Sequence, residues 1–327
     1  MNFLVVGGAG YIGSVIVEEL VRGRHSVLVL DDLSTGHRDA VAPLALLIQG
    51  SISDPAKLRE AFTTKDLDFV IHLAARSIVA DSVADPEGYR QANVDQGVVL
   101  LDAMKEHGVR NIVFSSTAAV YDATSPMPLT EDSPMGPANP YGETKLAFEG
   151  ILRERAERGE LQDVCLRYFN VAGASIDHGE DHREETHLIP LLLDAARGAR
   201  DPVPVYGTDY ATPDGTAIRD YIHVVDLADA HVRAVRHLAE GKGRATFNLG
   251  TERGASVREV IEVVEQVTGK TVPTHEAPRR AGDSPVLIAS SEQARRVLGW
   301  TQRFGDLDVI IETAWVWRQR YPEGYQE

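Results

Sequence analysis

The stretch Gly7-Gly-Ala-Gly10-Tyr-Ile-Gly13 decides the fold that this chain is expected to adopt. It follows a short apolar run at 3–6 and opens a helical pattern at 11–21. In a strand–turn–helix unit, a first glycine permits the tight turn, a second lets the backbone approach a pyrophosphate, and a third allows close helix packing. The amino end of the helix then faces the phosphates. A glycine-rich turn without a ligand is the alternative, but the strand before it and the amphipathic helix after it favour a dinucleotide site.

Short apolar runs recur through the first half of the chain and alternate with helical patterns. The runs lie at 27–30, 46–48, 69–73, 112–114 and 164–169, and the helical patterns at 55–62, 86–107 and 141–158. The runs are β-branched and apolar at odd and even positions alike, as in strands that are buried on both faces of a parallel sheet. The alternation predicts an α/β fold with a doubly wound, Rossmann-type parallel sheet and right-handed crossovers.

The regular alternation ends near Asn170. Residues 172–185 have the composition of a long polar loop, and 205–219 are rich in turn combinations. Further helices are expected at 225–238, 256–267, 291–298 and 307–317. Because 327 residues exceed what one core usually supports, we expect a nucleotide-binding domain over 1–170. A second, smaller substrate-binding domain should cover most of 171–327, with 221–249 returning to the first domain.

Composition excludes several classes of function. The 33 Lys and Arg residues against 49 Asp and Glu give a net charge of −16, which argues against a nucleic-acid-binding surface. Cys165 is the single cysteine, so an intrachain disulfide and a thiolate metal cluster are both excluded. No apolar run reaches about 18 residues, and the chain enters its first strand without a basic leader. We therefore expect a cytoplasmic protein without a membrane span. We also expect no metal, because no group of His, Asp and Glu in the sequence has the spacing of metal ligands.

Asp31 closes the second predicted strand. A carboxylate at this position accepts hydrogen bonds from the adenosine ribose and repels a 2′-phosphate. Together with the glycine turn, Asp31 predicts NAD rather than NADP as the cofactor.

The motif Tyr141-Gly-Glu-Thr-Lys145 predicts chemistry at the nicotinamide. Residues four apart share one face of a helix, so the hydroxyl and the ammonium can point to one site. A free tyrosine has a pKa of about 10, but a nearby ammonium and a positively charged nicotinamide should both lower it. Such pairs are common on helix surfaces, but this one follows a predicted strand that ends in Ser115-Ser116-Thr117. The combination favours Tyr141 as the catalytic base.

Together these residues resemble the extended short-chain dehydrogenase/reductase superfamily and, within it, the UDP-glucose 4-epimerase family. The resemblance continues through Arg167-Tyr-Phe-Asn170, Tyr206-Gly-Thr-Asp-Tyr, 219–229 and Arg279-Arg-Ala-Gly-Asp283. It implies reversible inversion at C4 of a UDP-hexose through a 4-keto intermediate, with NAD bound tightly. It also implies a homodimer formed through the helices at 86–107 and 141–158. Core packing explains the apolar stripe of the first helix equally well (Val94, Val98, Leu101 and Met104).

The resemblance implies three sets of site residues. The catalytic set is Thr117, Tyr141 and Lys145. The residues expected to contact NAD are Gly7, Gly10, Tyr11, Ile12, Gly13, Asp31, Asp32, Ser34, Thr35, Gly36, Ser51, Ile52, Leu73, Ala74, Ala75, Asn93, Ser115, Tyr141, Lys145 and Tyr168. The residues expected to contact the UDP-sugar are Thr117, Asn170, His187, Leu188, Tyr206, Arg219, Arg280, Asp283 and Leu287.

The resemblance also implies roles for the residues at the UDP moiety. Arg219 and Arg280 form a diphosphate clamp, since guanidinium forks match phosphate oxygens and stay charged. Asn170 donates to a phosphate oxygen, Asp283 accepts from the uridine ribose, and Tyr206 lies against the uracil.

Five positions depart from the family pattern, the first being Val6, which stands where many members have Thr. Asp32 stands where Asn is usual, Ser51 where Asp is common, Leu73 where Phe is common and His187 where Asn is frequent. Asp32 and Ser51 alter the expected adenosine contacts, so they bear on the affinity for the cofactor and not on its identity.

Other activities on the same scaffold stay open to different degrees. Nucleotide-sugar dehydratases typically carry Asp-Glu directly after the catalytic threonine, whereas Ala118-Ala119 follow Thr117 here. A non-catalytic NAD-binding regulator can dispense with the Tyr/Lys pair, which this chain retains. Epimerases of UDP-pentoses, UDP-uronates or UDP-N-acetylhexosamines are not excluded. Leu287, expected beside the 2-substituent, is intermediate in size, so UDP-glucose and UDP-galactose should be better substrates than their N-acetylated forms.

Overall fold

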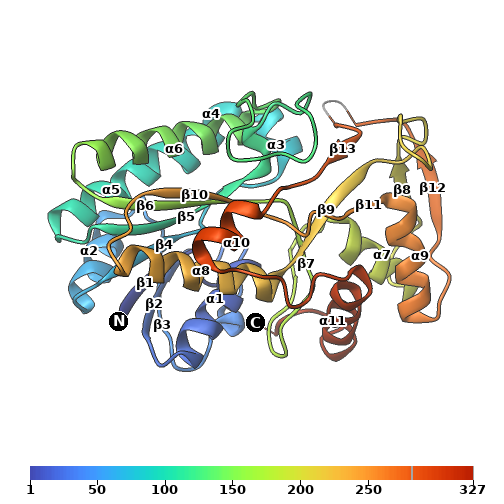
Figure 1. The fold of residues 1–327 in the computed structure, drawn as a ribbon. Helices are drawn as coiled ribbons and strands as arrows, with labels where there is room; N and C mark the ends of the chain where they lie inside the picture. The colour runs from blue at the N-terminus through green and yellow to red at the C-terminus, as the bar shows by residue number, and fades with distance from the viewer. Residues whose placement is uncertain (281–282, 327) are drawn as a thin grey trace.

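The computed structural model describes residues 1–280 and 283–326 and confirms the predicted doubly wound α/β fold. Its large sheet has seven parallel strands in the order β10-β6-β5-β4-β1-β2-β3 (Figure 1). They are β1 (Asn2–Val6), β2 (Ser26–Asp31), β3 (Leu46–Gln49), β4 (Phe69–His72), β5 (Asn111–Thr117), β6 (Gln162–Tyr168) and β10 (Ala245–Leu249). The strand order reverses between β1 and β4, which is where such sheets bind their ligands.

Each face of this sheet packs into its own hydrophobic core. Successive side chains of a strand point to opposite faces, so Phe3 and Val5 join one cluster while Leu4 and Val6 join the other. Helices α1 (Tyr11–Arg22) and α8 (Val224–Ala239) cover the first face. Helices α2 (Pro55–Thr64), α5 (Gln96–Glu106) and α6 (Pro140–Glu157) cover the second. Figure 1 shows α8 and β10 beside α1 and β6, although they come late in the chain.

The expectation of one continuous helix at 86–107 is wrong in detail. The structure has α4 (Pro86–Arg90), a π-helical turn at Gln91–Asp95 and then α5. The wider turn lies at Asn93, whose buried side chain bonds the backbone of Arg76 and the hydroxyl of Thr144. π-Helical turns of this kind are frequent at functional sites.

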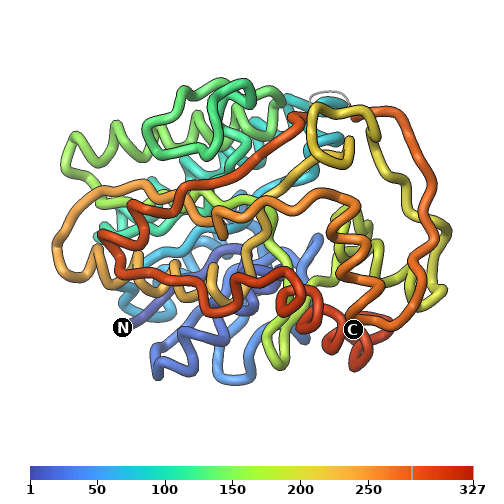
Figure 2. The backbone as a smooth tube through the Cα atoms, turned by 45° about the vertical axis from the view of Figure 1, so that its right-hand side comes forward, coloured from blue at the N-terminus to red at the C-terminus, as the bar shows by residue number. Residues whose placement is uncertain are grey.

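The second part of the chain surrounds a smaller core. Strand β9 (Ile218–His223) pairs with β7 (Asn170–Ala172), β11 (Gly254–Ser256) and β13 (Val286–Leu287), and β8 (Val203–Tyr206) pairs with β12 (Thr274–Ala277). Its helices are α7 (Leu188–Ala196), α9 (Val257–Thr268) and α11 (Leu307–Arg320), which pack on one another. Figure 2 shows this part gathered at one end of the large sheet.

The remaining described helices are short. They are α3 (Val79–Ala84), α10 (Glu292–Leu298) and the 3-10 turns Arg38–Ala40 and Ala118–Val120. Across the described residues, no helix combines the length and apolar character that a bilayer crossing demands. The domain limits at 170 and 171, with 221–249 returning to the first domain, stay a prediction that the position of β10 supports.

Candidate active site

The glycine turn has the shape that a dinucleotide needs. Gly7 has a φ of +84°, and a Cβ there would lie 2.6 Å from the backbone nitrogen of Ala74. A Cβ on Gly13 would lie 2.1 Å from the carbonyl oxygen of Gly7. Gly10, at the amino end of α1, differs: the nearest neighbour of a Cβ there is the Gly7 oxygen at 3.7 Å. The N-terminus of α1 is therefore open to a close-lying anion, and the residues fit a pyrophosphate.

Asp31 is fixed at the carboxyl end of β2. One carboxylate oxygen accepts from the amide of Ala9 at 2.9 Å, and the other accepts from the amide of Leu33 at 2.9 Å. Burial raises the pKa of Asp31. Since a carboxylate oxygen accepts more than one hydrogen bond, both oxygens can also receive ribose hydroxyls. This arrangement fits the predicted NAD site.

The predicted adenosine residues lie beside Asp31 on two loops. Asp32 accepts from the amide of Ser34 at 2.9 Å, and the hydroxyl of Ser51 accepts from the amide of Ser53 at 3.1 Å. Gly36 lies against the glycine turn, because a Cβ there would be 2.8 Å from the carbonyl carbon of Ala9. Of the neighbouring residues, Thr35 is exposed and Ile52 is buried.

The loop after β4 closes the other side of the glycine turn. The amides of Leu73 and Ala74 donate to the carbonyl of Val6 at 2.9 and 3.0 Å. Asn93 holds this loop, because its oxygen accepts from the Arg76 amide at 2.8 Å and its nitrogen donates to the Arg76 carbonyl at 3.0 Å. The structure gives Asn93 a positioning role here, and its direct contact with NAD stays a prediction.

Local structure brings Tyr141 to Thr117. Helix α6 begins at Pro140, and Asn139 caps it by accepting from the amide of Gly142 at 2.9 Å. A Cβ on Gly142 would lie 2.3 Å from the carbonyl oxygen of Ala119, so the start of α6 rests directly on the loop after Thr117. The hydroxyl of Thr117 lies close enough to Tyr141 to oppose the rise in the pKa of Tyr141 that burial causes. The structure therefore brings these two residues together, and their shared role at O4 stays a prediction.

Lys145 lies one turn further along α6 and is buried. Its ammonium donates to the carbonyl of Ser115 at 2.9 Å and lies 6.0 Å from the centre of the Tyr141 ring. Desolvation lowers the pKa of Lys145 to about 7, and the nearby carboxylate of Glu149 opposes this shift.

The expected effect of Lys145 on Tyr141 is wrong. Burial raises the pKa of Tyr141 to about 12, and only the hydrogen bond from Thr117 works clearly in the opposite direction. The reason is that Lys145, with a pKa near 7, carries a full charge only at acid pH. The lowering by a positively charged nicotinamide stays a prediction.

A buried polar network beneath the site was missed by sequence reasoning. Glu149 accepts from the hydroxyl of Ser116 and forms a two-pronged pair with Arg167, whose Nε lies 2.9 Å away. Tyr168 hydrogen-bonds Ser115, and burial raises the pKa of Tyr168. The available signal was Glu149 itself, a carboxylate one helical turn after Lys145. This network fixes the end of β5, on which Thr117 stands.

The predicted substrate residues gather on β9, β8 and the segments after β12. Arg219 donates to the carbonyl of Ser284 at 2.8 Å and pairs with the carboxylate of Asp283 at 3.4 Å. The guanidinium of Arg280 lies 4.0 Å from the centre of the Tyr206 ring. Each predicted phosphate-binding arginine therefore contacts another predicted substrate residue: Arg219 contacts Asp283, and Arg280 contacts Tyr206. Ala281 and Gly282, in the same motif, lie outside the described residues.

Asn170 and Leu287 both lie next to β9. Asn170 is opposite Tyr221 in the β7–β9 pair, and Leu287 is opposite Arg219 in the β13–β9 pair. Leu287 also packs against the cluster that contains Ala118. It therefore lies between the predicted phosphate clamp and the loop after Thr117, which suits a residue beside the sugar.

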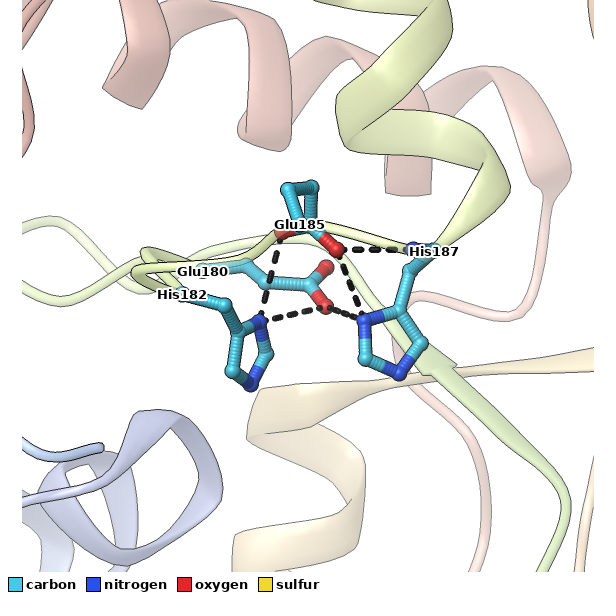
Figure 3. Close-up of side chains that lie close together, drawn as sticks. All are labelled: Glu180, His182, Glu185 and His187. Atoms are coloured by element: carbon cyan, nitrogen blue, oxygen red, sulfur yellow. Dashed lines mark hydrogen bonds and ion pairs between the residues drawn. The ribbon is translucent and has the colours of Figure 1, made fainter. Parts of the chain in front are cut away.

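His187 and Leu188 mark the start of α7. The imidazole of His187 faces Glu180 and Glu185, each 2.9 Å from its Nδ1 (Figure 3). These three residues and His182 form a group whose ligand atoms all lie within 4.8 Å of one another. We call the four residues the His–Glu cluster. The expectation that no such group exists is therefore wrong, and the overlooked signal was the spacing Glu-x-His-x-x-Glu-x-His.

Comparison with known proteins agrees with this geometry. Residues 3–250 match the NAD dependent epimerase/dehydratase family. The UDP-glucose 4-epimerase of Lacticaseibacillus casei is 48% identical, over 99% of this chain and 99% of that protein. The one from Corynebacterium glutamicum is 49% identical, over 96% and 95% respectively.

Solved structures are similar over the whole fold. The UDP-glucose 4-epimerase from Brucella ovis in complex with NAD is 47% identical with a TM-score of 0.93, over 96% of this chain and 97% of that one. The one from Bifidobacterium longum in complex with NAD+ and UDP is 36% identical with a TM-score of 0.94, over 99% and 100%.

Proposed function

The chain belongs to the NAD dependent epimerase/dehydratase family, and we propose that it inverts C4 of a UDP-hexose reversibly, interconverting UDP-glucose and UDP-galactose. The observation that carries this proposal is the proximity of Thr117 to Tyr141, with Lys145 buried one helical turn behind. Relatives that are 44–49% identical over nearly the full chain are UDP-glucose 4-epimerases.

NAD is the cofactor, and when bound it takes a hydride from C4 of the sugar and returns it. The glycine turn and the open amino end of α1 suit its pyrophosphate, and Asp31 disfavours a 2′-phosphate. Tyr141 removes the proton from O4 as the C4–H bond breaks, and Thr117 holds O4 through its hydroxyl. Tyr141 returns the proton to O4 when C4 receives the hydride on its other face.

The UDP moiety stays bound while the sugar rotates. Arg219 and Arg280 hold the diphosphate, since both guanidinium groups keep their charge throughout the cycle. Asp283 accepts from the uridine ribose, and Tyr206, already beside Arg280, lies against the uracil. The 4-keto sugar rotates about its bonds to the diphosphate and presents its opposite face for reduction.

The loop after Thr117 favours simple epimerisation over dehydration. Ala118 and Ala119 form a 3-10 turn with Val120, and Ala118 is buried. Methyl side chains cannot supply the acid and base that would remove water across C5 and C6. A regulator without turnover would have no use for the buried Lys145, whose desolvation is costly.

A homodimer through the helices at 86–107 and 141–158 is part of the proposal, as is a cytoplasmic location. Val94, Leu101 and Met104 are buried within the chain, so the apolar stripe belongs to the core. Val98 of this stripe is half-buried and the neighbouring Val99 is 40% exposed, so both are available to a partner. Sedimentation of the native protein and of Val99→Asp tests this contact. We expect a dimer for the native protein and a larger fraction of monomer for the variant.

Conversion of UDP-galactose tests the activity directly. Purified protein supplied with NAD should form UDP-glucose from UDP-galactose and the reverse, with no net consumption of NAD. UDP-xylose, UDP-glucuronate and UDP-N-acetylgalactosamine serve as competing substrates, and Tyr141→Phe is the control. No conversion of UDP-galactose, or a higher kcat/KM for one of the others, would contradict the proposal.

A further inference from the structure

The His–Glu cluster lies on the segment that connects β7 to α7. Glu180, His182 and Glu185 come from this connection, and His187 is the residue directly before α7. Figure 3 shows both imidazole rings with Nδ1 turned toward the two carboxylates. Four metal-ligating side chains from one short segment thus converge on a common centre, and one of them, His187, is also among the residues predicted to contact the UDP-sugar.

The distances between the donor atoms bracket the spacing around a tetrahedral ion. Nδ1 of His187 lies 2.9 Å from oxygens of Glu180 and Glu185, and Nδ1 of His182 lies 3.5 and 3.3 Å from oxygens of the same carboxylates. Zinc bonds to nitrogen and oxygen are about 2.0–2.2 Å long, which separates the ligand atoms of a tetrahedron by roughly 3.3–3.6 Å. All four ligand atoms lie within 4.8 Å of one another, so an ion at their centre would draw the widest pairs together and spread the pairs at 2.9 Å apart.

The burial of the carboxylates also favours a cation. The side chain of Glu180 is 8% exposed and that of Glu185 is 16% exposed, and both carboxyl groups face the same two imidazoles. Two shielded carboxylates repel each other unless a positive charge lies between them. Either a divalent ion or two protonated histidines can supply that charge, and these two cases differ in metal content.

We propose that Glu180, His182, Glu185 and His187 bind one Zn²⁺ or a similar divalent transition metal. Imidazole nitrogens suit Zn²⁺, Co²⁺ and Ni²⁺, whereas Mg²⁺ and Ca²⁺ prefer sites made of oxygen alone. With four protein ligands the tetrahedron is complete, so the ion has no open position for a substrate and serves a structural role.

The ion would fix the connection from β7 to α7 against the cofactor site. His182 packs edge-on to the ring of Tyr11, with 6.4 Å between ring centres, and Tyr11 belongs to the glycine turn. The hydroxyl of Tyr11 donates to the carbonyl of Gly173 at 2.6 Å, at the start of the same connection. Loss of the metal should therefore loosen NAD. This coupling rests on the proposed function, whereas metal binding itself does not.

Metal content provides the first test. Elemental analysis of native protein dialysed against Zn²⁺ and then against metal-free buffer should give about one Zn²⁺ per chain. The double variant His182→Gln/His187→Gln should fall to near zero. His178→Gln is the matched control, because His178 lies on the same connection but faces Glu18 at 2.9 Å, and it should keep its metal. Replacement by Co²⁺ should give the strong visible absorption of a tetrahedral site.

The structural role is tested on the native chain, so it does not depend on whether the variants fold. Chelation should lower the Tm by several degrees and speed the loss of NAD during gel filtration, and Zn²⁺ should reverse both effects. Native protein that holds no Zn²⁺, or a double variant that holds as much as the native chain, would overturn the proposal. Bound Zn²⁺ with no effect on Tm would overturn its structural role. Epimerase activity that persists without metal would leave the proposed function intact.

Discussion

Replacing Lys145 with methionine should stabilise the cofactor-free protein while it impairs turnover. Lys145 is buried, and its ammonium has a carbonyl partner, Ser115, at 2.9 Å. Burial lowers the pKa of Lys145 from 10.5 to about 7, which means that the folded chain pays to keep this group charged. Methionine has a similar length and no charge, so it removes that cost without opening a large cavity.

The magnitude follows from the pKa. A fall from 10.5 to about 7 corresponds to about 5 kcal/mol of unfavourable free energy when the group is charged in the folded state. The variant loses the hydrogen bond to Ser115, which costs about 1–3 kcal/mol because a buried carbonyl loses this donor. We therefore expect Lys145→Met to raise the free energy of unfolding by about 2–4 kcal/mol at pH 6.

The gain should depend on pH with a definite sign. Because the folded-state pKa is the lower one, the unfolded chain binds more protons between pH 7 and 10.5, and native stability rises with pH across that range. Methionine does not titrate. The advantage of the variant should therefore be largest below pH 7 and shrink as the pH approaches 10.5.

Urea denaturation of NAD-free protein at several pH values measures this effect. Lys105→Met is the matched control, since Lys105 is 61% exposed and its pair with Glu160 is worth at most about 1 kcal/mol. Turnover of UDP-galactose by Lys145→Met should fall by about 10²-fold or more, because the acid–base site loses its neighbour. A variant that is less stable than Lys105→Met at pH 6, or one with native turnover, would refute this reasoning.

Four further changes have expected outcomes. Tyr141→Phe should keep the fold and NAD binding but lower kcat by about 10²–10⁴-fold, and native turnover would remove Tyr141 from the role of base. Asp31→Gly should lower the ratio of the Kd for NADP to the Kd for NAD, because the carboxylate no longer repels a 2′-phosphate. Native protein that copurifies mainly with NADP would overturn the choice of NAD. Leu287→Tyr and Leu287→Ser should shift the kcat/KM ratio of UDP-galactose to UDP-N-acetylgalactosamine in opposite directions by about 10-fold or more, and an unchanged ratio would place Leu287 away from the sugar. Burial lowers the pKa of His231 from 6.5 to about 4, so protonation of this residue favours the unfolded chain. The free energy of unfolding should therefore fall by about 3 kcal/mol between pH 6.5 and pH 4. Urea titrations of His231→Gln at these two pH values should not show this fall.

The local sequence was sufficient to predict the strands of the large sheet and the glycine turn. The predicted runs at 3–6, 27–30, 46–48, 69–73, 112–114 and 164–169 all contribute strands to that sheet. Five of these strands are buried on both faces and are therefore apolar at odd and even positions alike, whereas the edge strand β3 leaves Leu46 48% exposed. The glycines of the turn are local requirements too, because Gly7 has a φ of +84° and a Cβ on Gly13 would lie 2.1 Å from the carbonyl oxygen of Gly7. Features of this kind depend on neighbours in the chain, and sequence carries them directly.

Two elements needed the tertiary structure. Helix α7 was not predicted because six of its nine residues are buried, so its sequence has no polar face to mark the helical period. The π-helical turn within 86–107 places Asn93 beside the loop after β4, where its side chain bonds the backbone of Arg76. The spacing of apolar residues does not predict a polar contact of this kind.

The chemistry of the site was decided by packing. The motif at Tyr141 and Lys145 predicted which residues meet, but burial sets their pKa values at about 12 and about 7 and reverses the expected shift of the tyrosine. Arg219 and Asp283 pair across distant segments, and Glu149 meets Arg167 from another element. Desolvation and long-range pairing depend on what the whole fold excludes from water. Sequence therefore determined the residues of this site, and only the tertiary structure determined their charges and partners.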